Sequence, residues 1–163
     1  MKASDIMTTN PACCTPERAA RDVANLMHAN HCGLIPVIND EESKLLVGVV
    51  TDRDLALRGM GRNRSAETPV SELMSRDVSC CMLDDDIEEV ERIMAERQVR
   101  RVPVIDDSGA IVGIIAQADL ARRAGDELTT EEVGRVVEEI SEPINDERAD
   151  ADVGIRLDWK GEV

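Results

Sequence analysis

Hydrophobic and polar positions along this chain follow a pattern that occurs twice. In the first half, apolar residues three and four apart predict a helix over residues 17–30, because that spacing lines one helical face. Short apolar runs at 34–38 and 45–50 predict two strands, and a second helix is expected from Thr51 to about Arg58. The second half shows the same order, with helices at 85–97 and 117–124 and strands at 101–105 and 111–116.

The two halves also align residue by residue, which identifies an internal repeat. A shift of 67 positions places Ser4-Asp5-Ile6-Met7 over Ser71-Glu72-Leu73-Met74. Two residues are absent from the turn between the strands of the second copy, and the shift is then 65, which places Asp54 over Asp119. A true repeat tolerates a deletion in a turn, so the deletion agrees with a duplication. From the order of elements we predict an α+β protein of two β-α-β-β-α copies related by pseudo-twofold symmetry.

We expect three segments along the chain. The copies occupy residues 1–64 and 65–125, and an acidic tail follows at 126–163. The net charge of the chain is −15, and the tail alone carries 13 acidic and 4 basic side chains. Its apolar spacing predicts a helix at about 130–141, followed by an extended segment that we expect to make an intermolecular or partner contact. The alternating apolar residues of that segment are Val153, Ile155, Leu157 and Trp159.

The composition bears on partners and compartment. The negative charge would repel DNA or RNA, and one Trp with no Phe or Tyr leaves almost no rings for stacking bases, so nucleic-acid binding is not expected. The amino terminus has no apolar signal region and no stretch approaches a membrane span, so we expect no membrane insertion and a cytoplasmic location.

The cysteines give little support to metal or redox chemistry. There are five, an odd number, and four form the vicinal pairs Cys13-Cys14 and Cys80-Cys81. No C-x-x-C motif occurs and only two His are present, so neither a disulfide framework nor a metal site is predicted. No catalytic residues are predicted either, and we expect a protein that is not an enzyme and requires no cofactor. A thiol-redox or metal-responsive protein remains an alternative.

The order of motifs resembles the CBS (cystathionine-β-synthase) domain. Each copy shows an Asp-Ile-Met-like start, a helix, an apolar-Pro-Val-apolar strand, a turn and a Gly-containing strand that leads into Asp-Leu, and the resemblance covers residues 1–124. It implies a pair of CBS domains, which often dimerises. It also implies an adenine nucleotide as ligand, namely AMP, ADP or ATP, with S-adenosylmethionine or NAD as further possibilities.

The resemblance assigns roles to the first copy's motif Gly48-Val49-Val50-Thr51-Asp52-Arg53-Asp54. Asp54 would accept hydrogen bonds from the ribose hydroxyls, which suits a carboxylate because it can accept two donors. Thr51 would meet phosphate oxygens, and Arg53 would add positive charge. Thr-x-x-Asp at a helix start is also a capping pattern with Thr51 as N-cap, and the two roles are compatible.

The second copy departs from this motif. Asp119 keeps the ribose acceptor, but Ala116 replaces the Thr and Ala118 replaces the Arg. In related proteins, basic residues before the Pro-containing strand reach phosphates, and Arg100 and Arg101 occupy that position here. The alternative is that both are solvated or pair with nearby carboxylates. We expect unequal sites, with the one around Asp54 the better nucleotide site.

The adenine ring would be held by apolar contact and by backbone groups. The apolar residues are Ile35, Pro36, Val102 and Pro103, and the backbone groups lie near Ala12 and Ser79. The alternative is that these residues are ordinary strand core. The function that follows is a regulatory module that senses an adenine nucleotide and acts through a homodimer or on a partner enzyme or transporter. A scaffold that binds no ligand is the second hypothesis.

Overall fold

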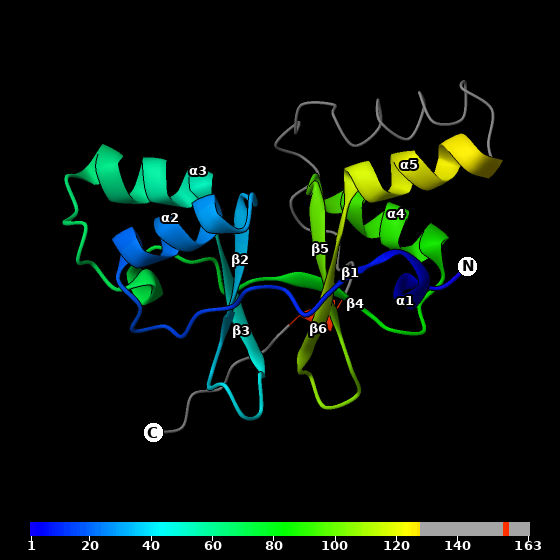
Figure 1. Ribbon diagram of the computed structural model, residues 1–163, viewed down its shortest axis with the longest axis horizontal. Coiled ribbons are helices and arrows are strands. Elements are labelled where there is room, and N and C mark those ends of the chain that lie inside the picture. The colour runs from blue at the N-terminus through cyan, green and yellow to red at the C-terminus, as the bar shows by residue number, and fades with distance from the viewer. Residues whose placement is uncertain (128–154, 157–163) are drawn as a thin grey trace. The chain divides into compact units, whose positions relative to one another are not determined.

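The computed structural model describes residues 1–127 and 155–156, and its elements alternate between helix and strand (Figure 1). The α-helices are α1 (Ala3–Ile6), α2 (Ala20–Ala29), α3 (Asp52–Asp54), α4 (Ile87–Arg97) and α5 (Gln117–Glu127). The strands are β1 (Thr8–Thr9), β2 (Leu34–Ile38), β3 (Leu46–Thr51), β4 (Ser79–Met82), β5 (Arg101–Ile105), β6 (Ile111–Ala116) and β7 (Ile155–Arg156). The α+β class is confirmed.

One predicted helix is different from the others. The helix expected from Thr51 to Arg58 consists of α3, a π-helical turn η1 (Leu55–Gly59) and a 3₁₀ turn η2 (Met60–Arg62). The Met60 N–H donates to the carbonyls of both Leu55 and Ala56, which widens the turn. The stretch ends at Asn63, whose φ of 52° is left-handed, a conformation that Asn tolerates better than most residues.

The predicted first strand forms in the second copy, but in the first copy a single bridge takes its place. In the second copy β4 runs parallel to β5, with Cys81 opposite Val104. In the first copy only one parallel bridge forms at the equivalent place, between Cys14 and Val37. Its two hydrogen bonds run from the Cys14 N–H to the Pro36 carbonyl at 3.1 Å and from the Ile38 N–H to the Cys14 carbonyl at 2.9 Å.

The described chain divides into two compact units that do not follow the boundaries of the copies. Asn10–Val78 and Ser108–Ile111 belong to the unit around the first copy, called the copy-one unit. Met1–Thr9, Ser79–Asp107 and the described residues 112–127 and 155–156 belong to the copy-two unit. The amino-terminal segment of each copy therefore lies in the unit built around the other copy.

Backbone hydrogen bonds hold these exchanged segments in the same way in both units. In each unit, two successive N–H groups of the incoming segment donate to carbonyls ahead of the long helix. The donors and acceptors are Ala3 to Asp85 (2.8 Å) and Ser4 to Leu83 (3.1 Å), and Val70 to Arg18 (2.9 Å) and Ser71 to Pro16 (3.0 Å). These residues correspond under the shift of 67, so the repeat is also a repeat of hydrogen bonds.

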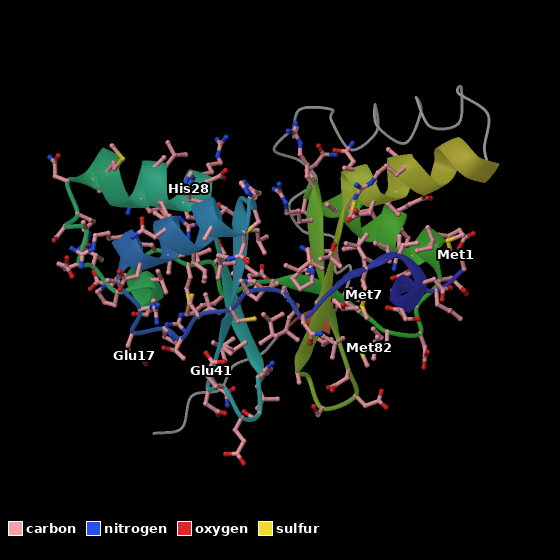
Figure 2. The ribbon with its side chains drawn as sticks, in the orientation of Figure 1. Met1, Met7, Glu17, His28, Glu41 and Met82 are labelled. Carbon is pink, nitrogen blue, oxygen red and sulfur yellow. The ribbon has the colours of Figure 1, made fainter. Side chains whose placement is uncertain are left out.

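The two repeated Met residues explain the repeated Gly of the strands. Met7, labelled in Figure 2, lies against Gly113 of β6, where an added Cβ would overlap its Sδ. Met74 lies against Gly48 of β3, where a Cβ would stand 3.0 Å from its Sδ and 2.9 Å from the Ser75 carbonyl oxygen. A side chain on either Gly would displace the Met, so the strand needs Gly at this close approach.

Each unit has its own aliphatic core, in which helices pack on the strands. In the copy-one unit α2 contacts β2, and in the copy-two unit α4 contacts β4 and β5 (Figure 1). The buried cluster of the copy-one unit is Cys14, Val23, Met27, Ile35, Val37, Val47, Val50, Val70 and Met74. The cluster of the copy-two unit is Ala3, Cys81, Val90, Ile93, Met94, Val102, Val104, Ile115 and Leu120.

The sheets show how the exchanged segments and part of the tail are attached. In the copy-two unit the strand order is β1-β6-β5-β4-β7, with β1 antiparallel to β6. β2 and β3 form an antiparallel hairpin, and Glu41 lies at its tip (Figure 2). The predicted tail helix at 130–141 and Trp159 lie outside the described residues. Ile155–Arg156 pair with β4 of the same chain. The intermolecular or partner contact expected of the extended segment stays a prediction.

No helix in the described part of the chain is both long and apolar enough to cross a membrane.

Candidate ligand site

The strand-to-helix junction of the copy-one unit is closed by a reciprocal cap between Thr51 and Asp54. The Asp54 N–H donates to Thr51 Oγ1 at 3.1 Å, while the Thr51 N–H and hydroxyl donate to Asp54 Oδ2 at 2.9 and 2.8 Å. The capping interpretation of this motif is thus confirmed. Because the Thr51 hydroxyl hydrogen is already donated to Asp54, the structure gives Thr51 the role of holding the carboxylate.

The second oxygen of Asp54 faces a residue that the sequence analysis missed. Arg58, one turn further on, places Nε 3.5 Å from Asp54 Oδ1. The Asp54 side chain is 14% exposed, so it lies in a recess and not free in solvent. An acid and a base four residues apart on a helix attract each other, and this spacing was a signal that could have identified Arg58.

The copy-two unit repeats half of this arrangement. The Ala116 N–H donates to Asp119 Oδ2 at 2.8 Å, as the Thr51 N–H does to Asp54. Ala116 has no hydroxyl, so the second bond to this oxygen is missing. Asp119 Oδ1 forms an ion pair with Arg122, three residues on, and the Asp119 side chain is 12% exposed. Both carboxylates are therefore recessed and paired with Arg, but only Asp54 is held by a full cap.

The start of the Pro-containing strand adjoins the start of the helix in each unit. The Asp52 N–H donates to the Gly33 carbonyl at 3.1 Å, and the Gln117 N–H donates to the Arg100 carbonyl at 2.9 Å. These bonds correspond in the two copies. They bring Arg100 near the junction that carries Asp119, which sequence spacing alone did not establish.

The charges at this junction differ between the copies. In the copy-one unit the Asp52 carboxylate packs on Gly33, where an added Cβ would lie 2.7 Å from its Oδ2. The copy-two unit has Arg100 and Gln117 in these places. A side chain at position 33 would have to displace the Asp52 carboxylate. An Arg at the position of Gly33 therefore does not fit together with Asp52 in its present place.

The predicted phosphate contacts are exposed. Arg53, Arg100 and Arg101 all lie on the surface. Within the described chain, none of the ion pairs involves any of these three guanidinium groups. They are accessible cations beside the two strand-to-helix junctions.

The predicted adenine contacts lie deeper. Ile35 and Val102 are fully buried in the two core clusters, and Pro36 and Pro103 are buried beside them. Burial gives Ile35 and Val102 a packing role in their strands. Ala12 and Ser79 are partly buried, and the structure pairs Ser79 with Arg156 of β7.

The vicinal cysteines are protonated, and all of them except the partly buried Cys13 are buried. Burial raises the pKa of Cys13 and of Cys80 to about 11, and that of Cys14 and of Cys81 to about 12. A thiol is a nucleophile and a metal ligand only as the thiolate, so these groups are inert near neutral pH. Within the described residues, no group of three His, Cys, Asp or Glu side chains is placed to hold a metal ion.

Comparison with known proteins identifies the family. The family model for the CBS domain matches residues 3–60 and again residues 70–126. The CBS domain-containing protein YhcV of Bacillus subtilis is 36% identical over 137 residues, which cover 84% of this chain and 93% of that protein. This chain belongs to the CBS domain family and carries two CBS domains. Neither matched region is a catalytic domain.

Two solved structures illustrate what similar chains hold. Hypoxic Response Protein I with two coordinated zinc ions has a TM-score of 0.68 and 32% identity, covering 75% of this chain and 98% of that one. CBSX2 in complex with AMP has a TM-score of 0.66 and 27% identity, covering 77% of this chain and 96% of that one.

Proposed function

We propose that this chain is a regulatory module that binds an adenine nucleotide, AMP, ADP or ATP, with Asp54 as the main ribose acceptor. The observation that carries the proposal is the state of the Asp54 carboxylate. Its Oδ2 is fully used by the Thr51 cap, and its Oδ1 lies 3.5 Å from Arg58 with no closer donor described. A fixed, recessed carboxylate whose second oxygen has only this long contact can accept a hydrogen bond from a ribose hydroxyl.

The AMP complex of CBSX2 supports the choice of ligand class, because that chain shares the family and 27% of its residues. In our proposal Arg53 adds positive charge for the phosphate beside Asp54. Asp119 with Arg100 and Arg101 forms a second, weaker site. The apolar residues Pro36 and Pro103 line the base, with backbone groups near Ala12 and Ser79 at its edge.

Binding would matter through a second protein. We propose that the nucleotide shifts the equilibrium between two states of a homodimer, or its docking on a partner enzyme or transporter. A ligand can do so only by binding one state more tightly than the other. The protein would act in the cytoplasm.

A thermal-shift panel tests the proposal. AMP, ADP, ATP, S-adenosylmethionine and NAD are each added to wild type, to Asp54→Ala and to Asp84→Ala, an exposed carboxylate in a turn that serves as the control. A ligand at about 100 times its Kd stabilises the native state by about 2.7 kcal/mol, which raises Tm by roughly 5–10 °C. We expect this shift in wild type and Asp84→Ala, and at most about half of it in Asp54→Ala, because a tenfold weaker site is still partly filled at the same ligand concentration.

The shift on adding ligand is the readout, because the loss of the cap lowers the starting Tm of Asp54→Ala. If no adenine nucleotide shifts the wild-type Tm, the proposal is wrong and the chain is a scaffold that binds no nucleotide.

A further inference from the structure

Arg58 joins the candidate ribose acceptor to a distant stretch of backbone. Its Nη1 donates to the carbonyls of Leu73 at 3.0 Å and Met74 at 3.1 Å and to the Ser75 hydroxyl at 3.3 Å. On its other side, Nε lies 3.5 Å from Asp54 Oδ1. One guanidinium thus bridges the site and a segment that follows it by 15 residues or more, which its planar fork allows.

The segment held by Arg58 belongs to the copy-one unit and leads to one of the places where the chain passes between the two units. It follows a 3₁₀ turn, η3 (Val70–Glu72), and its residues Leu73 and Met74 are buried in the copy-one unit. Ser75 exchanges two backbone hydrogen bonds with Val49 of β3, at 2.9 and 2.8 Å. Three residues after Ser75 the chain leaves this unit and enters β4 of the other.

A ligand hydroxyl at Asp54 would act on the same contact. The only oxygen of Asp54 that the cap leaves open is Oδ1, and this oxygen faces Arg58. A hydroxyl can donate and accept together, so it can donate to Oδ1 and accept from Nε of Arg58. Ligand binding would replace a long ion-pair contact by two hydrogen bonds and hold the guanidinium more firmly.

We infer that Arg58 is the positioning residue of the Asp54 site and that it couples nucleotide binding to the attachment of Leu73–Ser75. This inference rests on the proposed function. Coupling between two equilibria is reciprocal. The bound nucleotide therefore favours the attached state of the segment by the same factor by which the attached segment strengthens nucleotide binding. Nucleotide binding then changes the attachment of Leu73–Ser75, three residues before the chain leaves the copy-one unit.

Hydrogen exchange at the Ser75 amide, followed by NMR, measures the attachment of the segment, since this amide donates to the Val49 carbonyl. Isothermal calorimetry with AMP on the same samples measures binding independently. The variants are Arg58→Met, Arg58→Lys and the control Arg62→Met, which removes an exposed guanidinium on the next turn with no described bond to the segment.

In wild type and Arg62→Met we expect AMP to slow Ser75 exchange by roughly threefold to tenfold, the range for charge-assisted bonds of a half-exposed side chain. In Arg58→Met, exchange without ligand is faster by a similar factor, AMP no longer slows it, and AMP binds more weakly by that factor. Arg58→Lys keeps the charge but lacks the planar guanidinium, and it should give the same loss of coupling. It replaces Arg58→Met in the test if Arg58→Met does not fold.

Two results overturn the inference while leaving the proposed function intact. One is AMP binding to Arg58→Met as tightly as to wild type. The other is a wild type that binds AMP by calorimetry with unchanged exchange at Ser75. If calorimetry detects no binding of AMP or of any other adenine nucleotide to wild type, the proposed function fails and the inference fails with it.

Discussion

The two copies share a set of equivalent backbone hydrogen bonds and differ in the chemistry of their sites. Each receives the other's amino-terminal segment through equivalent hydrogen bonds, and each joins the start of its Pro-containing strand to the start of its second helix. At the junction itself the side chains diverge. Asp54 is held by Thr51 and backed by Arg58, whereas Asp119 lacks the hydroxyl and is backed by Arg122.

This difference separates what the fold requires from what the ligand requires. Positions that make the backbone contacts, such as Gly48 and Gly113 under Met74 and Met7, are the same in both copies. Several positions that would face a ligand differ, although Asp54 and Asp119 correspond. The acidic residue Asp52 packs on Gly33, and Arg100 with a neutral Gln117 takes its place in the other copy. A duplicated scaffold can thus carry two unequal sites.

The largest effect that we expect concerns a feature that the copies share, the buried thiols Cys14, Cys80 and Cys81. Their folded-state pKa values of about 12, 11 and 12 lie above the ordinary value of 9.0. The unfolded chain therefore releases these protons first. Stability is intact below about pH 9 and falls as pH rises toward 11–12, by roughly 1.4 kcal/mol per pH unit for each thiol.

Urea unfolding at pH 8, 9, 10 and 11 measures this loss. Cys14→Ala and Cys81→Ala are matched variants from the two copies. Each should reduce the slope of unfolding free energy against pH by the contribution of one thiol, roughly 1.4 kcal/mol per pH unit. The slope is compared instead of the stability at one pH, because each variant also leaves a cavity. A slope that neither variant changes would show that other groups cause the alkaline loss.

The second prediction compares the two glycines. Gly48→Ala and Gly113→Ala should each lower the free energy of unfolding by about 1–3 kcal/mol through overpacking. The loss should be greater at Gly48, where the Cβ meets the Ser75 carbonyl oxygen at 2.9 Å, than at Gly113, where it meets only the Met7 side chain. Chemical denaturation of both variants checks this order. Equal stability of the variants and wild type would contradict the packing described for the two Met residues.

The third prediction exchanges the caps. Thr51→Ala should lower the free energy of unfolding by about 1 kcal/mol, because it removes the hydroxyl that accepts from the Asp54 N–H. Ala116→Thr supplies the missing hydroxyl beside Asp119 and should raise stability by roughly 0.5 kcal/mol. Thermal and urea unfolding of the two variants measure these changes. If Ala116→Thr destabilises the protein, the two junctions differ in backbone as well as in side chain.

Local patterns predicted most of the fold. The apolar runs at 34–38, 101–105 and 111–116 match β2, β5 and β6, because a buried strand needs a continuous apolar stretch. The exchange of amino-terminal segments could not be predicted, since the alignment of Ser4 with Ser71 is the same whichever unit receives each segment. The π-helical turn at Leu55–Gly59 has no clear sequence signal.

The site was predicted in part, for a similar reason. The Thr51–Asp54 pair is local, and its spacing indicated both a cap and a ligand contact. The spacing of Arg58 from Asp54 could have indicated their ion pair, but its bonds to Leu73 and Met74 form only in the folded chain. The base contact expected at Ile35 and Val102 stays a prediction, because an apolar run does not show which of its residues face the core and both are fully buried in this structure.

Calorimetric titration of AMP into wild type, Asp54→Ala and Asp119→Ala tests the inequality of the two sites most directly. We predict that Asp54→Ala weakens the tighter binding event by at least about tenfold, the loss expected when hydrogen bonds to a charged group are removed. Asp119→Ala should leave that event unchanged. The account would be contradicted by equal losses in the two variants, or by tight binding that survives Asp54→Ala and disappears in Asp119→Ala.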